Sequence, residues 1–183
     1  MRRLIIHIKD PSTDFLEPIY KDLKHTTVVR TWQYPQIMNA LIDTHDQVIM
    51  LGHGGPVGLF ADMNGLMISQ ANVEALQRKN NSVFIWCFAA SFVRSMGLKG
   101  FSTSMFISEG GEARWTLHEK YKDEDEPAVH EQNDLFVRLV AENIEKPVHQ
   151  LYADVHAQFN PDAVVSENKE VLNFNRNGLI LEQ

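Results

Sequence analysis

Short runs of branched apolar residues alternate with longer amphipathic segments over the first 107 residues of the chain. The runs cover residues 4–8, 26–31, 47–51, 83–88 and 101–107. Between them, apolar residues recur at helical spacing. Strands that alternate with helices are typical of a parallel sheet covered by helices. We therefore expect an α/β fold, a three-layer α/β/α sandwich with a mainly parallel sheet of about six strands.

The segments between the runs predict the helices of this sandwich. Ser12, Thr13 and Asp14 offer N-cap side chains to a first helix. The expected helices cover residues 12–24, 34–44, 70–80 and 89–98, followed by a helix-rich stretch over 129–159 that Pro147 divides.

Turn residues predict two further pieces of β structure. Asp62-Met63-Asn64-Gly65 lies between apolar residues and predicts a small hairpin within 57–69. Asn177-Gly178 predicts one more hairpin or an edge strand within 171–181. Because an open strand edge can pair with a second copy of the chain, a homodimer through this C-terminal strand is one expectation. The charge run over 119–126 (EKYKDEDE) is typical of a solvated loop.

Composition indicates one globular domain over residues 1–183. Hydrophobic residues make up 44% and charged residues 22%, and a chain of this length can bury one core. The net charge of −7 and the lack of a basic tract argue against nucleic acid or an anionic membrane as partner. No stretch reaches the roughly 18 apolar residues of a membrane helix, and we expect no signal peptide.

Cys87 is the single cysteine of the chain. One cysteine excludes an intrachain disulfide framework and a cysteine-rich zinc module, and it suggests a reducing compartment. We therefore expect a cytoplasmic protein.

Two reactive side chains follow neighbouring predicted strands. His53 ends the third run in VIMLGHGG, and Cys87 ends the fourth in VFIWCFAAS. Functional groups of open parallel sheets gather at the carboxyl ends of the strands, and a right-handed crossover puts both residues on one edge. A thiolate attacks carbonyl carbon, and a nearby imidazole can lower the thiol pKa or remove its proton. We therefore predict a nucleophile and its base.

The glycines after His53 suit the same chemistry. Gly54 and Gly55 leave the backbone bare, so that an N–H can approach the carbonyl oxygen of a bound substrate. Such an N–H, together with the N–H of Cys87, would form an oxyanion hole. The dipole of the helix that starts after Cys87 would favour a thiolate.

These residues resemble a known family. The caspase-like cysteine peptidases (caspases, legumains, gingipains and CHAT-type domains) carry a His-Gly after one strand and a Cys after the next, and the matching positions here are His53-Gly54 and Cys87. The resemblance covers residues 1–110 or so and rests on two short motifs and the strand order. It implies a thiol endopeptidase, with Cys87 as nucleophile, His53 as base and Gly54 in the oxyanion hole. A peptide or protein would be the substrate, and no cofactor or metal is expected.

Other polar residues are candidates on the same edge. Glu109 follows the fifth strand, where its carboxylate could bind a basic substrate side chain, or could cap the helix that begins near Gly111. Asp10, at the end of the first strand, is interpreted as a turn former. Ser91 and Arg94 lie in the helix after Cys87, and Arg94 is expected at the surface.

Two alternatives stay open from the residues alone. A lone cysteine at a strand end is most often an inert buried residue, and a His in a Gly-rich turn can serve the turn alone. Trp86, the single thiol and the lack of a recognisable specificity pocket then indicate a non-catalytic caspase-like or flavodoxin-like binding module for a protein or small anion. His149 and His156 are seven residues apart, but no carboxylate pair completes a metal site. The Gly52–Pro56 loop could cradle a phosphate, although it lacks both the GxGxxG spacing and the Walker lysine.

Overall fold

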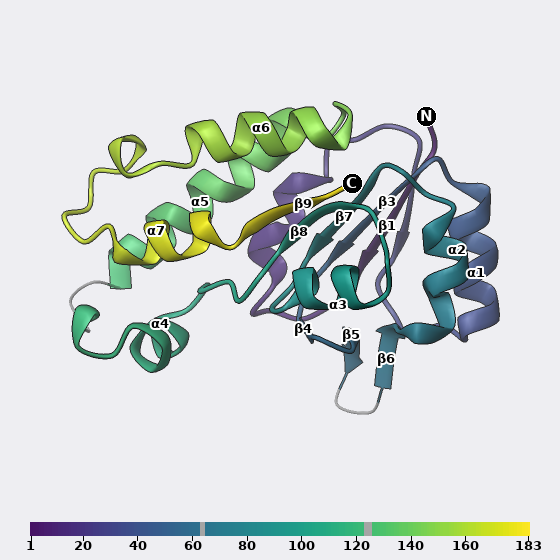
Figure 1. Ribbon diagram of the computed structural model, residues 1–183, viewed down its shortest axis with the longest axis horizontal. Coiled ribbons are helices and arrows are strands. Elements are labelled where there is room, and N and C mark those ends of the chain that lie inside the picture. Colours follow the sequence, from purple (N-terminus) through teal and green to yellow (C-terminus); the bar gives the residue numbers. More distant parts are fainter. Residues whose placement is uncertain (63–64, 123–125) are drawn as a thin grey trace.

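A six-stranded, mostly parallel sheet forms the centre of the protein in the computed structural model (Figure 1). The structure describes residues 1–62, 65–122 and 126–183. The strand order is β2-β1-β3-β7-β8-β9. The strands are β1 (Arg3–His7), β2 (Thr26–Val29), β3 (Gln47–Leu51), β7 (Ser82–Ile85), β8 (Gly100–Thr103) and β9 (Leu179–Glu182). Five strands run parallel, and β9 pairs antiparallel with β8.

The strand side chains alternate between two hydrophobic cores, as the two-residue period of a strand requires. In β3, Val48 and Met50 face one core while Ile49 and Leu51 face the other. All five residues of β3 are buried. This explains why the central strands consist mainly of apolar residues, since a parallel sheet covered on both faces has no polar side.

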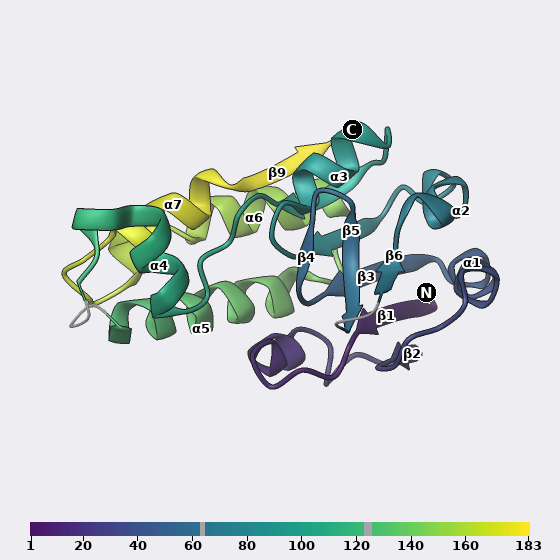
Figure 2. The ribbon, with the colours of Figure 1, turned by 90° about the horizontal axis from the view of Figure 1, so that it is seen from below.

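Helices cover both faces and complete the three-layer α/β/α sandwich that the sequence predicts (Figure 2). One face packs against α1 (Pro35–Thr44), α2 (Val73–Gln77) and α3 (Ala89–Ser95). The other packs against the 3₁₀ helix η1 (Asp14–Ile19), α5 (Glu126–Asn143) and α6 (Val148–Gln158). The helices α4 (Gly110–Leu117) and α7 (Glu170–Asn177) form a smaller cluster with α5 beyond the sheet.

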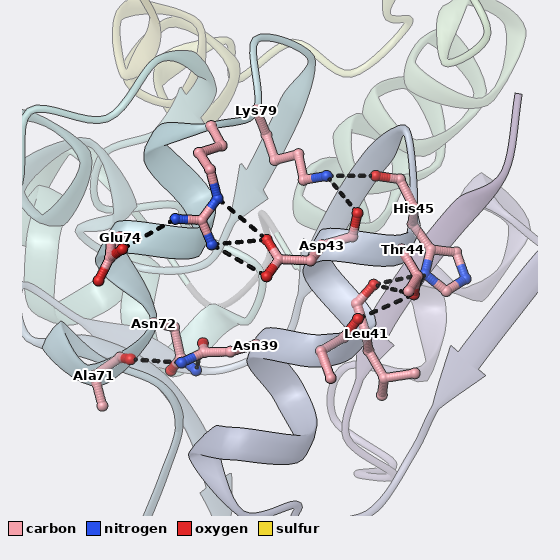
Figure 3. Close-up of polar contacts among 11 residues, drawn as sticks. Asn39, Leu41, Asp43, Thr44, His45, Ala71, Asn72, Glu74 and Lys79 are labelled. Carbon is pink, nitrogen blue, oxygen red and sulfur yellow. Dashed lines mark hydrogen bonds and ion pairs between the residues drawn. The ribbon is translucent and has the colours of Figure 1, made fainter.

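Polar contacts join α1 to the helix that precedes β7 (Figure 3). The Asp43 carboxylate pairs with Arg78 at 2.8 Å, and the Lys79 ammonium donates to the backbone oxygens of Asp43 and His45. Asn72 donates to Asn39 at 2.8 Å. These contacts hold the β3–β7 crossover, which joins the strands that precede His53 and Cys87, against α1.

A second, three-stranded antiparallel sheet follows β3. It contains β4 (Gly54–Gly55), β5 (Gly58–Asp62) and β6 (Gly65–Ile68). The predicted hairpin is therefore confirmed, although Met63 and Asn64 of its turn lie outside the described residues. The charge run over 119–126 is likewise described only in part.

Two segments differ from the sequence-based expectation. The helix expected over 12–24 is the short η1, because Pro18 lies inside it and lacks the N–H that an α-helix needs. The tail contains the expected edge strand, β9. The segment before it is the helix α7 and not the first strand of a hairpin, which was the other expectation. Val171, Leu172 and Asn175 are buried on one side of α7, which is a helical spacing.

The remaining elements lie close to the predicted ones. The 3₁₀ turn η2 (Gln70–Asn72) and α2 replace one helix over 70–80, and Pro147 separates α5 from α6 as expected. Within the described part of the chain, no helix is long and apolar enough to cross a membrane.

Candidate functional site

His53 lies two residues beyond β3, at the carboxyl edge of the sheet. Gly52 adopts a φ of +139°, a backbone conformation that glycine accepts and other residues rarely do. Its N–H donates to Ile85 O of β7 at 3.1 Å. This contact extends the pairing of the two strands and turns the chain so that the His53 side chain, 44% exposed, stands at the edge.

Cys87 follows the neighbouring strand β7 and precedes α3. The next residue, Phe88, has a φ of +66°, which is uncommon for a bulky side chain and is held by a hydrogen bond from its N–H to Ser104 O at 3.0 Å. The strand, the sharp turn and the helix thus present Cys87 at the same edge as His53. Strained turns of this kind are found where a strand presents a nucleophile.

The structure brings His53 and Cys87 into the lining of one small cavity of about 30 Å³. Other polar residues of this lining are Thr13, Ser108 and Glu112. A larger cavity of about 390 Å³ lies on the other side of His53, where Lys9, Asp10 and Phe60 contribute to its walls. His53, Gly52 and Thr13 line both cavities, so the two cavities adjoin at the imidazole.

The Cys87 thiol is protonated in this arrangement. Burial raises its pKa, and the charge of Glu112 acts in the same direction. The thiol donates a hydrogen bond to Phe106 O at 3.5 Å, and among the described residues it has no hydrogen bond to His53. In this structure the imidazole therefore does not lower the pKa of the Cys87 thiol, contrary to what the sequence had led us to expect.

The His53 ring instead contacts the loop after β1. Nε2 lies 2.6 Å from Ser12 Oγ and 3.8 Å from Asp10 Oδ2. Ser12 donates from both its N–H and its hydroxyl to Asp10 Oδ1, at 3.0 and 2.7 Å. These hydrogen bonds hold the pKa of Asp10 below its ordinary value, so Asp10 is a carboxylate at neutral pH.

A buried histidine stabilises this loop from below. His7 is the last residue of β1. Its Nδ1 lies 2.9 Å from Tyr20 Oη, and its Nε2 lies 3.2 Å from Thr13 Oγ1. Burial, with the Arg30 guanidinium acting in the same direction, lowers the pKa of His7 from 6.5 to about 4. His7 is therefore neutral at physiological pH and serves to position Thr13.

Gly54 and Gly55 form β4 and fit closely against Trp86. A Cβ built at Gly54 would lie 2.7 Å from Gly58 O and closer still to the Trp86 ring. The Trp86 indole donates to Gly55 O at 3.1 Å and is almost fully buried. The two glycines thus accommodate the large residue that precedes Cys87.

The expected oxyanion-hole donors are the backbone N–H groups of Gly54 and Cys87. Phe60 N–H donates to His53 O at 2.8 Å, which makes Gly54 and Leu59 the next, non-hydrogen-bonded pair of the β4–β5 ladder. The Gly54 N–H therefore points away from β5. The Cys87 N–H likewise has no hydrogen-bond partner among the residues that the structure describes.

Buried amides hold the segment that faces the thiol. Asn175 accepts from Ile107 N–H at 2.7 Å and donates to Ile107 O at 2.8 Å, and Gln132 donates to the same oxygen at 3.0 Å. Asn133 donates to Ser108 O at 2.8 Å. This amide cluster fixes residues 106–108, which supply Phe106 O to Cys87.

The other predicted residues lie in different places. Glu109 is exposed at the N-cap of α4, and its side chain makes no cap hydrogen bond. Glu112, one turn later, lines the cavity and accepts from Ser108 N–H and Oγ at 2.8 and 3.0 Å. Ser91 is exposed on α3, and Arg94 forms an ion pair with Glu182 of β9 at 2.8 Å.

His149 and His156, the two histidines considered for a metal site, do not lie in a cluster of metal-ligating side chains among the described residues. His156 packs on the Tyr152 ring, and burial followed by the charge of Arg176 lowers its pKa. His149 is exposed on α6. Over residues 1–62, 65–122 and 126–183, no group of three or more His, Cys, Asp or Glu side chains has the arrangement of a metal site.

Sequence reasoning missed Ser12 and Glu112 as site residues. Ser12 was expected as a helix cap, whereas its spacing from Asp10 is that of an Asx turn, a signal that could have located it. Glu112 had no comparable signal, because only the start of α4 at Gly110 decides which glutamate faces the cavity.

The fold and the site define an α/β protein with a thiol and an imidazole on adjoining strand ends. No protein-family model and no curated protein matches the chain.

Proposed function

We propose that this protein is a caspase-like cysteine peptidase in which Cys87 is the nucleophile and His53 the base. The observation that carries the proposal is the position of the two side chains, which follow the neighbouring parallel strands β3 and β7 and line one cavity. The order of the motifs, His-Gly first and Cys one crossover later, is the order that the resemblance implies. The substrate class is a peptide or protein, and the compartment that fits a lone free thiol is the cytoplasm.

The proposed reaction begins with proton transfer. His53 accepts the proton of the Cys87 thiol as the sulfur attacks the carbonyl carbon of the peptide bond, giving a tetrahedral oxyanion. The carbon–nitrogen bond then breaks, and the proton moves from His53 to the leaving amine. Water attacks the resulting thioester with His53 again as base, which releases the carboxylic acid and restores the thiol.

The oxyanion would be bound by the N–H groups of Cys87 and Gly54. Both are backbone donors whose positions are fixed by neighbouring strands and by the packing of Trp86 on Gly54. Fixed donors stabilise the developing charge without reorganisation.

The protonated thiol defines the resting state in this proposal. Because burial raises the Cys87 pKa, His53 acts as a general base during attack and not as a standing ion-pair partner. A cavity of about 30 Å³ holds little more than one water molecule. Substrate binding must therefore displace the Cys87–Phe106 contact and widen the cavity toward the larger depression beside His53.

The same observations favour a second candidate function. A half-buried, protonated thiol bound to a backbone carbonyl is typical of an inert cysteine. The alternative is a non-catalytic binding module, which would recognise a protein or small anion at the strand edge without cleaving it.

Peptide cleavage tests the leading proposal. A peptide mixture that presents all twenty residues at each position is incubated with wild type, Cys87→Ala, Cys87→Ser and His53→Ala, and products are identified by mass spectrometry. We expect cleavage by wild type and its loss in the Cys87→Ala and His53→Ala variants. Full activity in Cys87→Ser would overturn the assignment of the nucleophile.

Iodoacetamide alkylation separates the two candidates. A Cys87 thiol that reacts at neutral pH and reacts more slowly in His53→Ala supports the enzyme. A thiol that stays unmodified in the native protein and reacts only after unfolding supports the binding module.

A further inference from the structure

We propose that Asp10 and Ser12 form a relay that keeps the His53 proton on Nε2 and leaves Nδ1 as the basic nitrogen. The two residues are positioning residues, since they act on the imidazole and not on the substrate. The inference rests on the proposed function for its catalytic meaning, but the relay itself is a property of the resting protein.

The relay is a chain of three groups in the loop after β1. Asp10 Oδ1 lies 2.7 Å from Ser12 Oγ, and Ser12 Oγ lies 2.6 Å from His53 Nε2. Backbone contacts fix the loop, because Thr13 N–H donates to Asp10 O at 3.0 Å and Ser12 N–H donates to Asp10 Oδ1. The Thr13 hydroxyl donates to the same backbone oxygen at 3.2 Å.

The chemistry of the three groups decides where the protons lie. An ionised carboxylate can only accept a hydrogen bond, so Ser12 donates its single hydroxyl proton to Asp10. The Ser12 oxygen has no second proton, so it can only accept a hydrogen bond from His53. At 2.6 Å, His53 must carry a proton on Nε2 as the donor. The reverse arrangement would place two acceptor oxygens 2.7 Å apart without a proton between them.

This tautomer decides which nitrogen can serve Cys87. In the neutral ring, Nδ1 is the unprotonated atom and the one that can take the thiol proton. When it does, the imidazolium stays hydrogen-bonded through Ser12 to the Asp10 carboxylate. The charged and titratable groups that face His53 are Asp10 and Lys9 at the larger cavity, and Cys87 and Glu112 at the smaller one. Among these groups, Asp10 forms an ion-pair contact with the ring, with its Oδ2 3.8 Å from His53 Nε2.

The nitrogen NMR signals of the His53 ring test the relay. Protonated and unprotonated ring nitrogens have separate ¹⁵N shifts, so the tautomer can be read directly at about pH 8.5, well above the ordinary imidazole pKa of ~6.5. Wild type is expected to show a proton on Nε2 of His53. Ser12→Ala is expected to give a mixture of tautomers, and Ser12→Thr, which keeps the hydroxyl, to restore the wild-type signal. Exposed Ser91 supplies the control variant Ser91→Ala, which should leave the ring signals unchanged.

Acylation of Cys87 gives the second readout. The rate of acyl transfer from p-nitrophenyl acetate should fall about tenfold or more in Ser12→Ala and stay unchanged in Ser91→Ala. Only the Ser12 variant loses the hydrogen bond that orients the His53 base. Asp10→Asn should keep the tautomer, since its amide oxygen still accepts from Ser12, but should slow acylation through loss of the negative charge.

The outcomes separate the relay from the peptidase. A wild-type ring protonated on Nδ1, or a tautomer that Ser12→Ala leaves unchanged, would overturn the relay whatever the enzyme does. A proton on Nε2 in a protein that cleaves no peptide would keep the relay and reject the proposed function.

Discussion

At the scale of single residues, the candidate site depends on close fits that the sequence only partly reveals. His53 and Cys87 could be predicted because each follows an apolar run, and strand ends collect functional groups. The fit of Trp86 on Gly54 could not be predicted, because it depends on where β4 folds back beside β7. The Ser12–His53 contact, over 41 residues of sequence, depends in the same way on a loop conformation.

The fit at Gly54 predicts a strong effect of one methyl group. We expect Gly54→Ala to lower the free energy of unfolding by about 1–3 kcal/mol, since the added carbon meets the Trp86 ring and Gly58 O. Urea denaturation measures the change. Gly111→Ala is the matched control, because no atom lies within 4 Å of its Cβ position, and it should be neutral or stabilising. Equal stability of the Gly54→Ala protein and wild type would contradict the fit.

His7 predicts a specific pH dependence of stability. Its pKa is about 4 in the folded protein against 6.5 when unfolded, so the unfolded state binds more protons between these values. The contribution of neutral His7 to the free energy of unfolding is therefore fully present above pH 6.5. It decreases as the pH drops toward 4, by about 3 kcal/mol in total. Urea titrations of wild type and His7→Gln across this range isolate the contribution. Parallel curves for the two proteins would show that His7 is not buried in its neutral form.

At the scale of elements, the strands were easier to predict than the helices. Gln47–Leu51 is a strand with the predicted bounds because residues 48–51 are apolar and buried in the two cores. Buried Gln47 is instead satisfied by hydrogen bonds with Arg3 and Ile144 O. The segments around Pro18 and Asn175 were predicted less well. Pro18 interrupts the first helix locally, because it lacks the N–H that an α-helix needs. Asn175 instead bonds to Ile107 and Gln132, which are tertiary contacts that override local propensity.

The amide cluster predicts that α7 stabilises the loop facing Cys87. In Asn175→Ala the buried Ile107 N–H loses its acceptor, and the Ile107 oxygen loses one of its donors. We therefore expect the free energy of unfolding to fall by about 1–3 kcal/mol. Hydrogen exchange at the Ile107 amide should accelerate in the same variant. Asn173→Ala on the same helix is the control and should change neither quantity. Unchanged protection at Ile107 in Asn175→Ala would show that the loop is held by other contacts.

At the scale of the whole molecule, the sheet order places β9 at an edge. The layers and the parallel sheet followed from the alternation of apolar runs, whereas the antiparallel direction of β9 depends on α7, which the sequence did not reveal. The homodimer through this edge stays a prediction. Ser104 N–H donates to Gly178 O at 2.7 Å, so by alternation Ile180 pairs with β8 and the Leu181 N–H points outward.

A proline in β9 tests this dimer. Leu181→Pro removes an outward donor while leaving the hydrogen bonds to β8 in place, and Leu181→Ala truncates the same side chain but keeps the donor. Sedimentation velocity should show a dimer for wild type and Leu181→Ala, and a monomer for Leu181→Pro. A wild-type protein that remains monomeric at all concentrations would rule out the edge-strand dimer.

Acylation of Cys87 by p-nitrophenyl acetate, followed by intact mass and by release of p-nitrophenol, measures whether His53 serves as the base for the thiol. The ester is small and needs no specificity pocket, so its reaction reports the dyad itself. We expect wild type to form an acyl adduct on Cys87 about 10²-fold or more faster than His53→Ala. The exposed histidine variant His149→Ala should react at the wild-type rate. Equal rates in wild type and His53→Ala would contradict the catalytic dyad.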